Sequence, residues 1–290
     1  MVNGRADARI ISISRVAFCI LHFALLTVLI SCAPRRIQFP TDPGVPLPDF
    51  QPLHAQLAAA CTGVRTLTAV FGLSGRAGDE RLGGSIHAGF ERPASMRLEA
   101  VALGRPLFFL AARNGMATLL LNRESRILRG ASPEQVLGAL TGVDLAPADL
   151  QAILTGCVLP MPRPVGGRLH ADNWAAIEVE TPDGPARATI YLRRDEGQWQ
   201  LRGAERSGWR IEYPAWSGQF PQTVRLVSDP SAEAVAKADR PDVRVDLIAS
   251  VDQLRANEDL GPDVFTIDEP PGALPITLEE LRQIGPLRGE

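Results

Sequence analysis

The chain has 290 residues, of which 45% are hydrophobic and 22% charged, and its formal net charge is -3. This composition is typical of a globular protein, and the length allows one large or two small domains. Because there is no excess of basic residues, we do not expect nucleic acid as a partner.

The first 31 residues have the layout of a secretory signal. Three arginines precede an apolar run from Val16 to Ile30, and small residues follow it. At about 1.5 Å per residue, this run is short for a bilayer core of ~30 Å. Leu29-Ile30-Ser31-Cys32 also resembles the bacterial lipobox, whose cysteine is acylated and becomes the first residue after cleavage. We predict a lipoprotein signal peptide at 1–31 and lipidation of Cys32; the alternative is an ordinary signal peptide or N-terminal anchor with an incidental cysteine.

A proline-rich segment follows, with six prolines between Ala33 and Pro52. Such a segment stays extended at about 3 Å per residue, so residues 32–52 are predicted to form a lipidated tether of about 50–60 Å. The folded domain is then expected over residues 53–267. It begins with a short amphipathic helix, because Leu53, Leu57, Ala60 and Val64 recur at helical spacing.

Two cysteines remain in the exported part of the chain, Cys61 and Cys157. An even pair in an oxidising compartment is compatible with a disulfide. Two buried thiols are the alternative.

The segment from Met96 to Leu121 predicts neighbouring antiparallel strands. Met96 to Ala102 alternates apolar and polar residues, and Leu107 to Ala112 is apolar on both faces. Asn114-Gly115 is a favoured hairpin turn. Leu103 lies at the turn between the first two strands. It is expected either to tuck back onto the sheet or to point outward, and these residues leave both orientations open.

Two helices interrupt the strands. Ser132, Pro133 and Gln135 predict a helix start, and the helix ends at Gly142. A second helix begins at Pro147 and stops at Gly156. The apolar faces of these two helices are candidates for a lid, and their residues are Val136, Leu137, Leu140, Leu150, Ile153 and Leu154.

Strands resume after residue 164 and continue to about Ala249. The fold class is therefore mainly β: about eleven antiparallel strands in one curved sheet or unclosed barrel, with an inserted helical lid. Residues 268–290 form a tail with a short helix pattern, and the sequence gives it no position.

No catalytic constellation stands out. There is no nucleophile elbow or phosphate-binding glycine loop. His54, His87 and His170 lie far apart without ligand-spaced partners. We therefore expect no enzymatic activity, no metal and no cofactor.

A curved sheet leaves a concave face lined by its inward residues. Such a set most often forms a packed core, and the alternative is a ligand cavity closed by the two helices. The candidate residues for an apolar cavity are Phe71, Leu73, Ile86, Phe90, Met96, Leu98, Phe109 and Leu119.

The order of these motifs resembles the LolA/LolB family of lipoprotein carriers and receptors, most closely its outer-membrane receptor LolB. The resemblance covers roughly residues 67–249. It is clearest across 93–156, from the turn before Met96, through the Leu103-Gly104 turn, to the helices containing Leu137–Gly142 and Leu150–Gly156.

The resemblance implies an unclosed barrel whose cavity takes the acyl chains of lipoproteins from a periplasmic LolA-like carrier, without catalysis. It implies a monomer, anchored through its own lipid to the outer membrane and facing the periplasm. In the family an exposed leucine aids transfer to the membrane, and its counterpart here is Leu103. The alternative is an anchored envelope sensor or scaffold of the same fold with another lipidic ligand or partner.

Overall fold

Fifteen strands form one continuous sheet in a computed structural model that describes residues 36–181, 187–206, 208–228, 244–285 and 287. The order across the sheet is β1-β8-β9-β10-β11-β12-β13-β14-β2-β3-β4-β5-β6-β7-β15. All neighbouring pairs are antiparallel except β7 and β15. In the described chain the outermost strands β1 and β15 do not pair with each other. The predicted unclosed antiparallel barrel is therefore confirmed.

The helices and strands have the following bounds. The helices are α2 (Phe50–Thr62), α3 (Pro133–Thr141), α4 (Pro147–Thr155), the 3-10 turn η2 (Pro262–Phe265) and α5 (Leu278–Ile284). The first eight strands are β1 (Val45–Pro46), β2 (Thr66–Ala77), β3 (Glu80–Glu91), β4 (Ser95–Ala102), β5 (Arg105–Arg113), β6 (Met116–Leu121), β7 (Arg126–Ala131) and β8 (Arg163–His170). The others are β9 (Trp174–Glu180), β10 (Arg187–Asp195), β11 (Gln198–Arg206), β12 (Trp209–Ser217), β13 (Phe220–Ser228), β14 (Val245–Ala256) and β15 (Leu274–Pro275).

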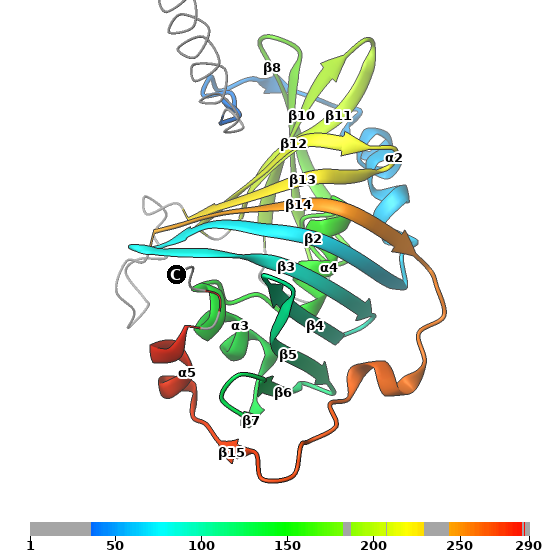
Figure 1. The fold of residues 1–290 in the computed structure, drawn as a ribbon. Coiled ribbons are helices and arrows are strands. Elements are labelled where there is room, and N and C mark those ends of the chain that lie inside the picture. The colour runs from blue at the N-terminus through cyan, green and yellow to red at the C-terminus, as the bar shows by residue number, and fades with distance from the viewer. Residues whose placement is uncertain (1–35, 182–186, 207, 229–243, 286, 288–290) are drawn as a thin grey trace, which may run out of the picture. The chain divides into compact units, whose positions relative to one another are not determined.

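Helices α3 and α4 begin and end where their capping residues predict. Ser132 accepts a hydrogen bond from the Gln135 backbone N–H, and the Gln135 side chain accepts one from the Ser132 N–H. Gly142 and Gly156 end the helices at φ values of 77° and 83°, a left-handed conformation that favours glycine. Both helices lie within the curve of the sheet (Figure 1), so their apolar faces and the concave face of the sheet form one core.

Most of the predicted tether belongs to the folded domain, because the folded unit begins at Ile37 rather than at Leu53. Phe39 is only 8% exposed and stacks on Tyr191, on the outer face of the sheet, with ring centroids 4.3 Å apart. Gly203 makes room for this ring, since a Cβ there would collide with it. The chain then pairs with the edge of β8 through β1 and continues into α2. Proline spacing predicted extension correctly but could not reveal that one aromatic residue fastens the segment.

The C-terminal tail also folds onto the domain. Residues 262–266 cross the outer face, where the Arg97 guanidinium donates to the carbonyls of Val264 and Thr266 at 3.2 and 2.8 Å. The tail then pairs with the edge of β7 through β15, and α5 packs on α3. Leu281 and Leu287 are buried in the core. The boundary predicted at 267/268 therefore does not separate an independent tail.

The two ends of the chain thus protect the two edges of the sheet in the same way. Each runs over the outer face and adds a two-residue strand to the edge, and each also contributes a helix: α2 contacts β8 and α4, and α5 contacts α3. Open sheet edges present unpaired backbone groups that recruit other chains, so such coverage limits edge-to-edge association.

Candidate functional site

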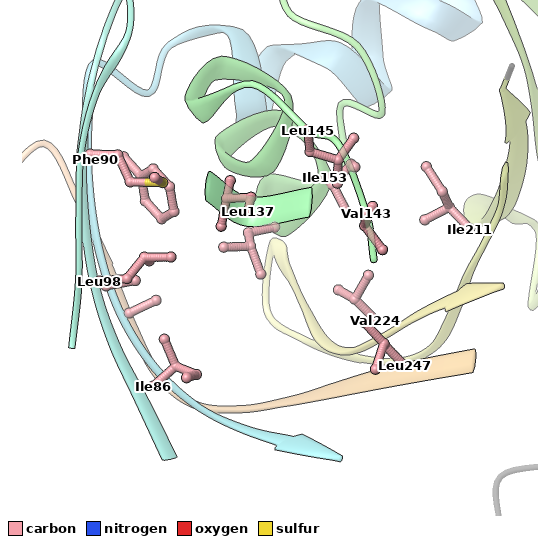
Figure 2. Close-up of a cluster of buried hydrophobic side chains, with 14 of the residues drawn as sticks. Ile86, Phe90, Leu98, Leu137, Val143, Leu145, Ile153, Ile211, Val224 and Leu247 are labelled. Carbon is pink, nitrogen blue, oxygen red and sulfur yellow. The ribbon is translucent and has the colours of Figure 1, made fainter. Parts of the chain in front are cut away.

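An apolar cavity of about 120 Å³ lies between the concave face of the sheet and helices α3 and α4. Figure 2 shows Ile86, Phe90 and Leu98 on one wall, Leu137 and Ile153 on the helices, and Val224 and Leu247 on the far strands. Thr141 is the one polar residue in its lining. The full lining is Phe71, Leu73, Ile86, Phe90, Leu98, Phe108, Leu137, Leu140, Thr141, Val143, Leu145, Leu150, Ile153, Leu154, Val224, Leu226, Leu247, Ala249 and Leu287.

Five of the eight residues proposed for the cavity line it. Met96 and Leu119 do not; both are fully buried in the surrounding core. The five lining residues are Phe71, Leu73, Ile86, Phe90 and Leu98.

Phe109 is on the opposite face, and Phe108 takes the expected place. Phe109 pairs with Glu99 and lies 5.5 Å under the Arg97 guanidinium, whereas Phe108 pairs with inward-facing Ala100. The reason is a β-bulge between Ala100 and Val101, which shifts the register by one residue. A regular two-residue hairpin would have placed Phe109 inside. A one-residue shift exchanges the faces of a strand, and a strand that is apolar on both faces gives no warning of it.

Five of the six proposed lid residues also line the cavity, and the sixth, Val136, is fully buried behind them. Other lining residues, from β13, β14, the loop between the helices and the tail, were not predicted from the sequence. The alternation in β13 and β14 could have indicated Val224 and Leu247; Leu287 carried no such signal.

Helix α4 is fastened to the rest of the domain by polar and covalent links. The structure joins Cys61 on α2 to Cys157, just after α4, in a disulfide with a Cα–Cα distance of 5.7 Å. The buried Tyr213 hydroxyl donates to the Ile153 carbonyl at 3.1 Å. Arg206 on β11 contacts the Asp149 carboxylate at 2.8 Å, and the Gln151 amide donates to the Arg65 carbonyl at 3.3 Å.

Helix α3 is held differently. Within the described part of the chain, the side-chain hydrogen bonds of α3 stay within the helix, its N-cap and the turn after it. Its remaining contacts are apolar, with the core and with α5. Helix α5 is in turn fixed by an ion pair between Arg126 and Glu280, and Arg126 holds the pKa of that carboxyl down to about 2. Of the two helices over the cavity, α3 therefore needs fewer bonds broken to move.

Leu103 occupies the outward orientation that the sequence left open. It lies in the two-residue turn between β4 and β5, and its side chain is 102% exposed. Its φ is +50°, which is uncommon for residues other than glycine, asparagine and aspartate. A leucine here gains nothing from packing and strains its backbone, and such an outlier justifies a functional hypothesis.

A larger hollow of about 330 Å³ lies on the outer face beneath Leu260 and Val264. Arg97, Glu99 and Arg255 contribute to its wall. An apolar ligand would remove these charges from water at a substantial cost. The inner cavity is thus the better site for an apolar ligand despite its smaller volume.

The described residues hold no group of three or more side chains suited to a metal ion. Burial lowers the pKa of His54, while His87 lies on the outer face in the wall of the larger hollow. The ring of His170 lies 3.3 Å from the Asp42 carboxylate near the β8 edge.

In the part of the chain with described structure, no helix is both long and apolar enough to cross a membrane. Predicted lipidation at Cys32 falls outside the described residues.

Several solved structures resemble this fold, although their sequences are only distantly similar to this chain. No protein-family model matches the sequence, and no curated protein is significantly similar to it. A DUF1329 family protein from Desulfovibrio piger is 12% identical, over 77% of this chain and 98% of that one, with a TM-score of 0.48. A putative outer membrane lipoprotein-sorting protein domain from Vibrio parahaemolyticus is 9% identical, over 73% and 94%, with a TM-score of 0.45. A LolA superfamily protein from Nitrosomonas europaea is also 9% identical, over 74% and 97%, with a TM-score of 0.45.

Proposed function

We propose that this chain is a lipid-anchored envelope protein that binds the acyl chains of lipoproteins in the cavity beneath α3 and α4. It receives them from a periplasmic carrier and passes them to the outer membrane, without catalysing a reaction. The observation that carries the proposal is the almost wholly apolar lining between a curved sheet and two helices. The motif order shared with the LolA/LolB family supports it.

The energetics favour an apolar cavity as the source of affinity. Transfer of an acyl chain out of water stabilises by about 0.8 kcal/mol per CH₂, so one long chain contributes roughly 10 kcal/mol. Reversible acceptance from a carrier requires a comparably dry site. Ion pairs or hydrogen bonds in the lining would raise the cost of that transfer, and the lining contains almost no group able to form them.

The cavity must enlarge to take such a ligand. Its volume of about 120 Å³ is below the roughly 300–1,000 Å³ of sites that hold small organic molecules. Helix α3 is the part that moves in this proposal, because apolar contacts hold it whereas α4 carries the disulfide and the bonds from Tyr213, Arg206 and Gln151. Acyl chains then replace α3 side chains as the apolar partner of the sheet.

Leu103 serves delivery in this proposal rather than affinity. One leucine entering a membrane contributes only about 2 kcal/mol, much less than an acyl chain. Leu103→Glu should leave the free energy of unfolding and acyl binding unchanged but slow the release of bound lipopeptide to vesicles. Met116→Glu, at another exposed apolar position, is the matched control.

The direct test fills the cavity. Ala249 lines it, and Ala249→Phe places a phenyl ring in the space, whereas Ala55→Phe adds the same ring on the exposed side of α2. Mass spectrometry of lipids that co-purify with each mature chain should find acyl lipid with the wild type and Ala55→Phe, and little with Ala249→Phe. Equal lipid in all three would refute cavity binding. Normal outer-membrane arrival of other lipoproteins after depletion of the protein would refute the receptor role alone.

A further inference from the structure

Exposed apolar side chains gather along one edge of the sheet. The described chain exposes seven large apolar side chains, and four of them lie on or beside β8. We call them the β8 edge patch: Val45 on β1 (59% exposed), Met161 two residues before β8 (63%), and Val165 and Leu169 on β8 (43% and 38%). Val45 and Leu169 are direct cross-strand partners. Single exposed apolar residues are normal, but a group of them points to a contact surface.

The chain reaches this patch along a fixed path. Arg210 donates to the Ile37 carbonyl, and its guanidinium lies 3.8 Å from the centre of the Phe39 ring. Phe39 also meets Trp174 edge to face, with centroids 6.2 Å apart. Farther along, Arg168 donates to the Pro43 carbonyl at 2.9 Å, and the Leu47 N–H donates to the Gly167 carbonyl at 3.0 Å. Residues 37–47 are therefore a strap bound to the β8–β12 half of the sheet.

The strap limits how far this half of the domain can lie from an anchor at Cys32. Only residues 33–36 separate Cys32 from Ile37, and five residue steps span at most about 18 Å. The predicted free spacer of about 50–60 Å is thus reduced to roughly a third. If Cys32 carries acyl chains, the first fixed residue of the domain stays close to the lipid surface.

The chemistry of the edge suits the boundary between water and lipid. Arg163 and Arg168 lie on β8 among these apolar residues and have exposed side chains, with Arg168 on the face opposite Leu169. Arg163 also pairs with Glu180. Arginines around an apolar strip match anionic headgroups above acyl chains, the arrangement found in proteins that lie on membranes.

We propose that the β8 edge patch rests in the headgroup layer of the membrane that holds the lipid of Cys32, so that the domain has a defined side toward the bilayer. The inference rests on the proposed function in taking Cys32 as the anchor. It adds a second, protein-mediated contact, which holds the domain against the surface instead of leaving it to swing on a long tether.

The test measures the patch without the lipid. The mature chain, residues 32–290, with Cys32→Ser is mixed with vesicles of phosphatidylethanolamine and phosphatidylglycerol, and the bound fraction is measured by flotation. We expect binding that falls at least tenfold in Val165→Asp/Leu169→Asp and stays within twofold in Met116→Asp, an exposed apolar position on β6. Leu169→Trp, which adds a side chain that favours membrane interfaces, should raise the bound fraction.

Three outcomes would overturn the proposal: no vesicle binding by the Cys32→Ser chain, undiminished binding by the double aspartate variant, or lower binding by Leu169→Trp than by its parent. If the double variant instead abolishes a concentration-dependent dimer seen by light scattering, the edge belongs to a second copy of the chain. Fatty-acid labelling of the wild-type chain and of Cys32→Ala tests the anchor separately.

Discussion

Helices α3 and α4 have the same length, similar proline starts and the same glycine ends, yet they are held in the domain by different forces. Helix α4 is joined through a disulfide, a buried tyrosine, an arginine and a glutamine. Helix α3 packs through apolar contacts, supported by α5. A hydrogen bond weakens steeply when its donor and acceptor move out of their preferred distance and angle. Apolar contacts are non-directional, so one apolar partner can replace another. A helix of the second kind can give way to an acyl chain.

The largest effect should come from removing the disulfide. Cys61→Ala/Cys157→Ala opens a link across a sequence separation of 96, and loop entropy for that length corresponds to about 4–5 kcal/mol. Urea unfolding should show a loss of this order. Hydrogen exchange should then rise more in α4 than in α3, although the bonds from Tyr213, Arg206 and Gln151 remain. If α4 keeps its protection relative to α3, the disulfide is not what distinguishes them.

Removing the support behind α3 should have the next largest effect. Leu281 on α5 is fully buried, so Leu281→Ala should destabilise the domain by about 2–4 kcal/mol. Because α5 packs on α3, the variant should raise hydrogen exchange in residues 133–141 more than in 147–155. An equal rise in both helices would show that α5 does not specifically support α3.

Tyr213→Phe tests one bond of α4. The variant removes the hydrogen bond to the Ile153 carbonyl and should cost about 1–2 kcal/mol in urea unfolding. Burial raises the pKa of the Tyr213 hydroxyl far above its ordinary value near 10. The unfolded chain therefore loses this proton first, and wild-type stability should fall as pH rises above about 10. Tyr213→Phe should show a smaller alkaline loss, and an unchanged loss would assign it to other groups.

The smallest expected effect is a loosening of α5 at low pH, when Glu280 becomes protonated. The pKa of Glu280 lies near 2, mainly because Arg126 donates to its carboxylate. A lowered pKa stabilises the folded state above the ordinary value near 4.5, and this contribution disappears as pH falls from about 4.5 toward 2. Exchange in α5 and α3 should rise over that interval relative to α4. Glu280→Gln should flatten the response, and an identical response in this variant would exclude the ion pair as its source.

The features that could be predicted from the sequence are those set by residues close together in the chain. Capping residues and glycines lie within a few positions of the helix ends, so the limits of α3 and α4 could be read from sequence. The unclosed barrel followed from alternation in the strands. The faces on which Phe108 and Phe109 lie could not be predicted, because a single β-bulge decides them and both residues are apolar.

The ends of the chain were harder to predict for a different reason. The partners of Phe39 and Leu287 come from distant parts of the sheet: Phe39 stacks on Tyr191, and the Leu287 carbonyl accepts a hydrogen bond from the Gly83 N–H. Proline spacing predicts an extended backbone but says nothing about what that backbone lies against. The strap, the coverage of both sheet edges and the contribution of the tail to the cavity depend on such long-range contacts.

The central claim is that acyl chains enter the cavity by displacing α3 while α4 stays in place. Hydrogen exchange of the mature chain, measured with and without a palmitoylated peptide, tests it most directly. We predict that α3 exchanges at least tenfold faster than α4 in the free protein. The peptide should slow exchange in α3 by stabilising the bound form, leave α4 within twofold, and have no effect on Ala249→Phe. Equal exchange in the two helices, or equal protection of both by the peptide, would contradict the account.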